Sequence, residues 1–448
     1  MREILLHDTR SGQLEALVPR EPGRVGIYAC GPTVYSRIHV GNARPYIVFS
    51  LLKRFLAHVG YDPTLVINVT DVNDKIYTAA LAARVPSAQL ASEMTSAYRA
   101  DTDALGLGRP DHEPLASETM DPIVAHIADL VEAGHAYEAG GDVFFRVRSD
   151  SAYGTLSHRQ VDDMDQGEGV EGTERKQDPL DFALWKSRKP DEDSFWSSPW
   201  GPGRPGWHIE CSAMAEGLLG LGFDIHGGGI DLVFPHHENE AAQTRMARGS
   251  ELARLWMHNG MLQASGEKMA KSVGNISPLH QVLDEHGRDT VLMYMCGAHY
   301  RQPIAFSSDL LEQARRRVDR LREAARLTHP GASPDELAPL HAAFFDALAR
   351  DFNMPEALGS LFEWVRQSNA RGGVGGAHLA EMLEMLGLES LLAAEHAGPP
   401  AEVAALAERR RAARQARNFA EADRLRAEIL ARGWEVRDVA DGFELLER

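Results

Sequence analysis

The chain has 448 residues, of which 44% are hydrophobic and 25% charged, enough for several domains with buried cores. Its formal net charge of −18 argues against a uniformly basic nucleic-acid coat, although RNA binding needs only a local basic stripe. Three cysteines are too few for a disulfide framework, and no segment is typical of a secretion signal or a membrane span. We therefore expect a soluble cytoplasmic enzyme that contacts no membrane.

The first elements along the chain predict an α/β fold. Residues 25–30 form an apolar run typical of a strand, and residues 46–59 carry the apolar spacing of a helix that Gly60 ends. Residues 65–70 predict a short buried strand. A strand–helix–strand order is typical of a βαβ unit, which implies a parallel sheet.

The composition of the sequence changes twice after these first elements. Residues 140–199 are rich in charge and turn residues, which indicates an insertion on the sheet. After Ser307 the pattern becomes helical, and residues 398–401 are typical of a linker. The tail beyond the linker begins with an arginine-rich helix and ends in a short strand-like piece.

Two cysteines, a histidine and a glutamate, far apart in the chain, suggest a metal site. Cys30 ends the first strand, and Cys211 closes the segment Trp-His-Ile-Glu-Cys. His236 and Glu240 are four residues apart after Pro235, which can open a helix, so their side chains share one helix face. Two thiolates, an imidazole and a carboxylate suit zinc, and we predict one Zn²⁺ per chain.

Two further segments carry a family resemblance. Residues 39–42 (His-Val-Gly-Asn) and 268–272 (Lys-Met-Ala-Lys-Ser) resemble the HIGH and KMSKS signatures of class I aminoacyl-tRNA synthetases, in the right order. With residues 207–211 and 226–240 added, the chain resembles a cysteinyl-tRNA synthetase. The resemblance implies ATP-dependent activation of L-cysteine and its transfer to tRNA-Cys, with Mg²⁺ accompanying ATP, in a protein expected to be a monomer.

The resemblance also implies how the chain is divided. It places an insertion between two halves of a Rossmann-type sheet, followed by an α-helical bundle and a small C-terminal α/β domain that binds the anticodon. The predicted segments are 1–125 and 201–306 for the two halves of the catalytic domain, 126–200 for the insertion, 307–397 for the bundle and 402–448 for the C-terminal domain.

The chemistry of the substrate suggests what the metal does. Serine differs from cysteine by one atom, and an apolar pocket separates such small changes by only about 10- to 200-fold. A thiol that binds zinc loses its proton and becomes a strong ligand, whereas a hydroxyl is a poorer one. The hypothesis is that the substrate sulfur binds the zinc. The alternative is a closed structural zinc, for which four protein ligands are the usual pattern.

The expected ATP site begins at the HIGH-like segment. The resemblance assigns His39 to the phosphates, and Gly41 leaves room for adenine at a helix start that favours phosphate. Asn42 replaces a histidine and cannot become cationic. The segment 226–231 is expected near ribose and adenine, with a tight glycine turn as the alternative. The full expected set is His39, Gly41, Asn42, Gly228, Gly229, Asp231 and Lys271.

The catalytic residues expected besides His39 are lysines of the KMSKS-like loop. Gly266 and Gly274 flank this polar loop, which suits a lid over the triphosphate. Lys271 is the first choice, and Lys268 the second, for neutralising charge as pyrophosphate leaves. Ala270 replaces a serine without loss of charge. A solvated lysine loop is the alternative.

The amino-acid pocket and the RNA contacts are also carried over by resemblance. Gly31, Thr33, Thr70 and Trp207 match positions that line the cysteine site, although Trp207 also fits core packing. In the tail, Arg410, Arg414 and Arg417 are expected on one helix face that meets phosphates, with a solvated charged helix as the alternative.

Two rival functions remain at this stage. The cysteine ligase of mycothiol biosynthesis joins activated cysteine to an amino sugar, but such ligases lack the anticodon domain, whereas residues 402–448 are present here. The other rival is a non-catalytic, zinc-dependent RNA-binding paralogue. Loss of His39 or Lys271 would indicate that fate, and both residues are retained.

Overall fold

The computed structural model describes residues 2–164, 173–264, 267–268, 277–392, 401–439 and 442–447. They fall into two compact units, Met1–Leu392 and Ala393–Arg448. Within these ranges, no helix combines the length and apolar composition that crossing a membrane requires.

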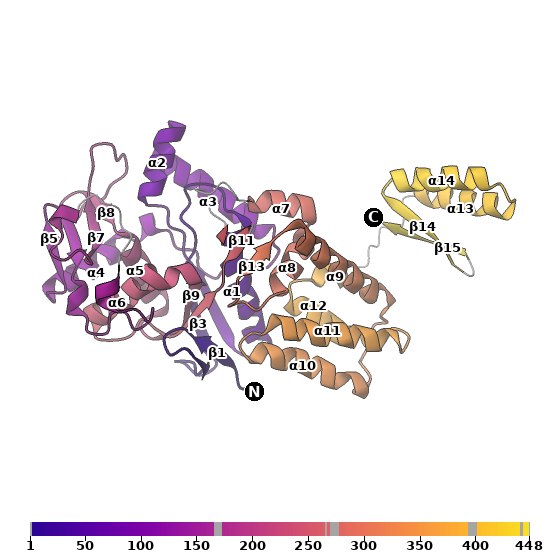
Figure 1. Cartoon of the computed structure of the whole chain (residues 1–448), viewed down its shortest axis with the longest axis horizontal. Helices are drawn as coiled ribbons and strands as arrows, with labels where there is room; N and C mark the ends of the chain where they lie inside the picture. Colours follow the sequence, from indigo (N-terminus) through magenta and orange to yellow (C-terminus); the bar gives the residue numbers. More distant parts are fainter. Residues whose placement is uncertain are drawn as a thin grey trace. The chain divides into compact units, whose positions relative to one another are not determined.

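A parallel sheet forms the centre of the first unit and confirms the predicted α/β class. Its strand order is β10-β9-β3-β4, and each neighbouring pair runs parallel. The long helix α1 (Val40–His58) connects β3 to β4 and packs on the sheet (Figure 1). The carboxyl ends of these strands meet at one edge, which is where α/β folds bind ligands. The strands are β3 (Arg24–Ala29), β4 (Asp62–Ile67), β9 (Phe223–Gly229) and β10 (Ala253–Asn259).

Further elements surround the sheet. The hairpin β1–β2 joins the edge strand β10, since Asp8 accepts from the Trp256 N–H at 2.8 Å. Helices α5 and α6 lie on the side toward the insertion. These elements are β1 (Leu5–Asp8), β2 (Gln13–Ala16), α2 (Asp74–Ala83), α3 (Ser87–Asp103), α4 (Met120–Glu132), α5 (Trp207–Leu219) and α6 (Glu238–Arg248).

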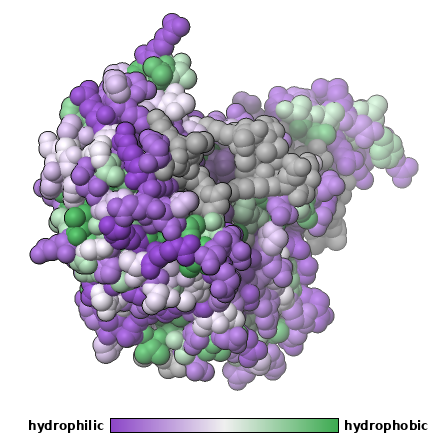
Figure 2. Space-filling model, turned by 60° about the vertical axis from the view of Figure 1, so that its left-hand side comes forward, coloured by the Kyte–Doolittle hydropathy of each residue, from purple (hydrophilic) through white to green (hydrophobic). Residues whose placement is uncertain are grey.

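The insertion forms an antiparallel sheet of its own, in the order β5-β6-β7-β8. Its aromatic residues pack into a separate core with α4, where the Phe145 and Phe182 rings stack at 4.9 Å. The outer face of this region is mainly hydrophilic, with hydrophobic residues in small scattered groups (Figure 2). The strands are β5 (Ala136–Ala139), β6 (Asp142–Phe145), β7 (Phe182–Ser187) and β8 (Gly203–Pro205).

A buried ion pair network attaches the insertion to α2. The Arg204 side chain is only 2% exposed and its Nε lies 3.0 Å from the Glu192 carboxylate, which is 4% exposed. Arg204 also pairs with Asp74 at the start of α2, and Lys186 contacts the same aspartate at 3.0 Å. Because Asp74 follows the end of β4 closely, this network fixes the insertion against the functional edge of the sheet.

We expect Arg204→Met to lower the free energy of unfolding by about 3–5 kcal/mol, because it leaves the buried Glu192 carboxylate without its counter-ion. The matched control is Lys186→Met, which removes a partly exposed cation from the same network and should cost less than about 1 kcal/mol. Urea unfolding of both variants followed by tryptophan fluorescence measures the difference. An equal loss of unfolding free energy in the two variants would contradict the view that the Arg204–Glu192 pair is the buried part of this network.

A small sheet and a helical bundle complete the first unit. The sheet has the order β12-β11-β13 and contains the strand that ends at Lys268. Helix α9 confirms the helical pattern predicted after Ser307 and buries one face through Leu311, Ala314, Val318, Leu321 and Ala324. These elements are β11 (Leu262–Ala264), β12 (Glu267–Lys268), α7 (Leu279–His286), α8 (Arg288–Cys296), β13 (Ile304–Phe306), α9 (Ser308–Leu327), α10 (Ala338–Ala349), α11 (Met354–Asn369) and α12 (Gly376–Met385).

The second unit has its own core. Helices α13 and α14 pack on a hairpin through residues that include Leu406, Leu425 and Trp434. The expected arginine face is wrong in two respects: Arg410 is only 3% exposed, and Arg417 lies beyond the end of α13 with φ +57°. The elements are α13 (Ala401–Gln415), α14 (Phe419–Ala431), β14 (Trp434–Val439) and β15 (Gly442–Glu447).

Candidate active site

The four residues expected to bind metal come together at the carboxyl edge of the central sheet. Cys30 follows β3, Cys211 lies on α5, and His236 and Glu240 lie on either side of the start of α6. All four side chains are buried, and their donor atoms lie within 4.8 Å of one another. Cys30 Sγ is 3.7 Å from Cys211 Sγ, 3.6 Å from His236 Nε2 and 3.6 Å from Glu240 Oε1.

These spacings fit a tetrahedral ion. Zinc bonds of about 2.0–2.3 Å place neighbouring ligand atoms about 3.3–3.8 Å apart. The pair His236 Nε2 and Glu240 Oε1, at 3.0 Å, is the closest of these distances and is that of a hydrogen bond. Small side-chain shifts therefore suffice for all four atoms to bind one ion.

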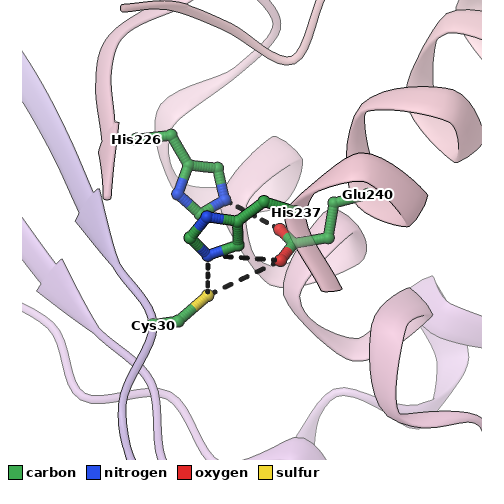
Figure 3. Close-up of side chains that lie close together, drawn as sticks. All are labelled: Cys30, His226, His237 and Glu240. Carbon is green, nitrogen blue, oxygen red and sulfur yellow. Dashed lines mark hydrogen bonds and ion pairs between the residues drawn. The ribbon is translucent and has the colours of Figure 1, made fainter. Parts of the chain in front are cut away.

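A second group of donors shares Cys30 and Glu240 with the first and adds His226 and His237 (Figure 3). His226 Nε2 lies 2.7 Å from Glu240 Oε2, and His237 Nε2 lies 3.3 Å from Cys30 Sγ. The 2.7 Å distance is that of a hydrogen bond and is shorter than two ligands of one ion adopt. These histidines therefore fit the role of hydrogen-bonding partners that orient the ligands.

Further histidines extend this outer layer. His208 Nδ1 lies 2.9 Å from His236 Nδ1, which leaves the Nε2 atom of His236 directed at the cysteines. His237 Nδ1 lies 2.7 Å from His258 Nε2, and His258 Nδ1 lies 2.7 Å from Thr9 Oγ1. The site is thus supported from β9, β10 and the N-terminal hairpin as well as from the helices.

Burial and the close approach of these donors shift their pKa values strongly. The hydrogen bond from Cys30 lowers the pKa of Cys211 to about 6, while burial raises the pKa of Cys30 well above its usual value. Burial disfavours the His236 cation, but the Glu240 carboxylate outweighs this and raises the pKa of His236 to about 10. A metal cation would displace these protons.

The residues expected to line the binding site of the substrate cysteine lie beside the metal donors. Gly31 donates its N–H to Asn68 Oδ1 at 2.9 Å, and a Cβ there would lie 1.7 Å from the Asn68 carbonyl oxygen, so only glycine fits. Thr33 and Thr70 form a β-bridge that closes the loop after β3 against the end of β4. Trp207 stacks on His236 with ring centroids 4.2 Å apart.

A cavity of about 1100 Å³ opens from this region toward the insertion. Thr33, Trp207 and His208 line its inner end, and Trp207 is only partly buried. Trp207 therefore presents part of its side chain to the cavity. Charged residues of both signs line its remainder: Lys75, Arg175, Lys176, Lys186, Arg188, Lys189 and Arg204 with Asp74, Asp142, Glu174, Asp191 and Glu192.

The HIGH-like segment forms the start of α1. His39 is the N-cap, and its Nδ1 accepts a hydrogen bond from the Gly41 N–H at 3.1 Å. Asn42 Oδ1 accepts from the His39 N–H at 3.2 Å, which completes a capping box. Asn42 therefore has a structural role that an amide performs well, and its lack of a cationic form does not affect that role.

The other residues expected to bind ATP belong to different elements of the structure. Residues 226–229 belong to β9, so the alternative of a tight glycine turn is wrong, and the His226 ring contacts Glu240 rather than the ATP region. Gly228 and Gly229 end this strand, and Asp231 is exposed in the turn after it. Lys268 ends β12, whereas Lys271 lies outside the described residues.

Sequence reasoning missed Glu210, which lies one residue before Cys211. Its side chain is fully buried, and its carboxylate lies beside Thr70. Burial, reinforced by the negative charge of Cys211, raises the pKa of Glu210 well above its usual range. A glutamate on a helix is ordinary in sequence, so no pattern distinguished it.

Comparison with known proteins places this geometry in context. The family model described as "tRNA synthetases class I (C) catalytic domain" matches residues 16–316. The cysteine–tRNA ligase of Shouchella clausii is 46% identical over 94% of this chain and 95% of its own length, and that of Halorhodospira halophila is 44% identical over 98% of both.

A solved structure shares the fold. The Mycobacterium tuberculosis methionyl-tRNA synthetase in complex with methionyl-adenylate aligns with a TM-score of 0.59 at 20% identity. The alignment covers 81% of this chain and 88% of that structure. At this level of identity the likeness concerns the fold alone.

Proposed function

From the premise that the chain belongs to the class I aminoacyl-tRNA synthetases of the cysteine–tRNA ligase family, we propose that it activates L-cysteine with ATP and transfers it to tRNA-Cys, using a zinc ion to recognise the thiol. The observation that carries the proposal is the buried set of Cys30, Cys211, His236 and Glu240 at the edge of the sheet. A buried set of two thiols, an imidazole and a carboxylate suits zinc in particular.

The protein's own residues then provide the selection. When bound, the zinc ion supplies a soft cationic site at which a thiol loses its proton. Trp207, stacked on His236, lies at the inner end of the cavity and limits the space beside the donors. His226 and His237 orient Glu240 and Cys30, so that the donors keep their arrangement when a substrate enters.

The start of α1 is the proposed binding site for the phosphates of ATP. The positive end of the helix dipole favours phosphate at the N-terminus of this helix, next to His39. We assign His39 and Lys271, with Lys268 second, to the negative charge that develops as the cysteine carboxylate attacks the α-phosphorus and pyrophosphate leaves. Magnesium would accompany the triphosphate.

The direct test is aminoacylation of a tRNA-Cys transcript, compared with ligation of cysteine to an amino sugar. We expect charging of tRNA and no amino-sugar product, because the chain aligns with cysteine–tRNA ligases over nearly its whole length and includes the second folded unit. Formation of the amino-sugar amide in place of charged tRNA would support the rival ligase. Absence of both activities would support the non-catalytic paralogue.

Lys271→Ala should reduce cysteine-dependent pyrophosphate exchange by about 10²-fold, because one charge that stabilises the transition state is removed. Cysteine binding measured by calorimetry should stay unchanged, since the metal donors are untouched. Lys271→Arg serves as the charge-retaining control and should keep part of the activity. Near-normal exchange in the alanine variant would refute the assignment.

A further inference from the structure

Arg44 is an arginine buried without a carboxylate partner. Its side chain is 1% exposed, near the start of α1. Its guanidinium donates to the Gly260 carbonyl at 2.5 Å and to the His299 carbonyl at 3.1 Å. Among the described residues it forms no ion pair with an acidic side chain, and burial lowers the pKa of Arg44 to about 10. Burying a cation among neutral groups is costly, so its retention calls for a specific role.

The two carbonyls belong to the base of the small sheet that holds Lys268. Gly260 follows β10 and leads into β11, and its N–H donates to the Tyr300 carbonyl at 2.8 Å. His299 precedes β13, which pairs with β11 in parallel, while β12 pairs with β11 on its other side. Arg44 therefore holds together the two chain segments from which this sheet starts.

The residues that follow the KMSKS-like segment also bond to the backbone at the start of α1. The Val40 N–H donates to the Ser277 carbonyl at 3.0 Å, and the Leu279 N–H donates to the Ile38 carbonyl at 3.0 Å. Both bonds lie beside His39. The residues that follow the segment 269–276 are thus bonded beside the start of α1, and Arg44 of the same helix is bonded to the residues that precede β11 and β13.

We propose that Arg44 is a positioning residue for adenylate formation, which fixes the β12-β11-β13 sheet relative to His39. It acts through backbone carbonyls and contacts neither substrate. The inference rests on the proposed function, because that function assigns the phosphate site to the start of α1 and part of the transition-state charge to Lys268, which ends β12. A planar guanidinium reaches two carbonyls at once, which a lysine ammonium or a neutral amide does less well.

The test compares Arg44→Gln with Arg288→Gln. Arg288, at the start of α8, likewise donates to two carbonyls, of Leu105 at 3.0 Å and Gly387 at 2.6 Å, but neither belongs to the small sheet. Both variants lose a guanidinium that donates to backbone carbonyls, and Arg288 additionally pairs with Asp289 at 3.3 Å. We expect Arg44→Gln to lower kcat for cysteine-dependent pyrophosphate exchange by about 10²-fold, with zinc content and the KM for cysteine unchanged. Arg288→Gln should lower the melting temperature and leave kcat intact.

Arg44→Lys keeps the test decisive if the glutamine variant does not fold. It retains the charge and should fold, yet it should lose about 10-fold in kcat, because one ammonium cannot bridge both carbonyls. Equal kcat values in the Arg44 and Arg288 variants, or a rise in the KM for cysteine at constant kcat, would overturn the inference alone. Absence of cysteine-dependent exchange in the unsubstituted protein would overturn the proposed function and this inference with it.

Discussion

Cys211→Ala is expected to abolish most of the preference for cysteine over serine. A site built to bind one polar group rejects an analogue lacking it by about 10⁴–10⁵-fold, whereas a pocket relying on shape reaches only about 10²-fold. Cys211 Sγ lies 3.7 Å from Cys30 Sγ in the donor set, so its loss removes one of two thiolates. We therefore expect the cysteine-to-serine ratio in pyrophosphate exchange to fall to about 10² or lower, with bound zinc lost.

The third cysteine supplies the matched control for this experiment. Cys296 is also buried, in α8, and burial alone raises its pKa to about 12. Cys296→Ala should lower stability but leave the bound zinc and the cysteine-to-serine ratio unchanged. A Cys211→Ala protein that loses its zinc and still prefers cysteine would show that the ion has only a structural role. Loss of the preference in both variants would point to a general effect of thiol removal on folding.

Truncation after Leu392 is expected to separate the two half-reactions. The second unit has a core of its own, and the donor set and the start of α1 lie entirely in the first. Pyrophosphate exchange should therefore continue at close to its normal rate. Charging of tRNA should fall by about 10²–10⁴-fold in kcat/KM, because a second, linked binding module contributes affinity of this order.

The salt dependence of charging provides an independent readout. Arg409, Arg411 and Arg414 are exposed on α13 of the second unit, whereas Arg410 is buried in it. If the exposed arginines meet phosphates, charging by the full chain should weaken more steeply with salt than charging by the truncated chain. Equal slopes, or a parallel loss of exchange and charging, would contradict a role for this unit in RNA binding.

The fold class follows from sequence because local patterns carried it. The apolar run before Cys30, the helical spacing of residues 46–59 and the next apolar run indicate a parallel βαβ unit. Parallel strands bring their carboxyl ends to one edge, so residues that follow different strands, such as Thr33 and Thr70, converge there although they are distant in sequence. Topology converts sequence distance into spatial proximity.

The contacts of individual side chains were not predictable in this way. His226 lies in an apolar and glycine-rich strand, and its bond to Glu240 depends on how α6 packs over β9. Arg410 stands among exposed arginines in the sequence, and only the packing of the second unit decides that it is buried. Arg44 and Arg204 are likewise ordinary charged residues until the tertiary structure encloses them.

The donor set draws on both sides of the insertion, since Cys30 precedes it and Cys211, His236 and Glu240 follow it. A nascent chain that has left the ribosome only as far as residue 210 holds a single one of these groups, and it acquires the last when residue 240 emerges. If the set binds zinc as proposed, the site can be completed only after the insertion has been synthesised, when just over half of the chain has left the ribosome. A filled site would then require that the two parts of the central sheet on either side of the insertion have folded together.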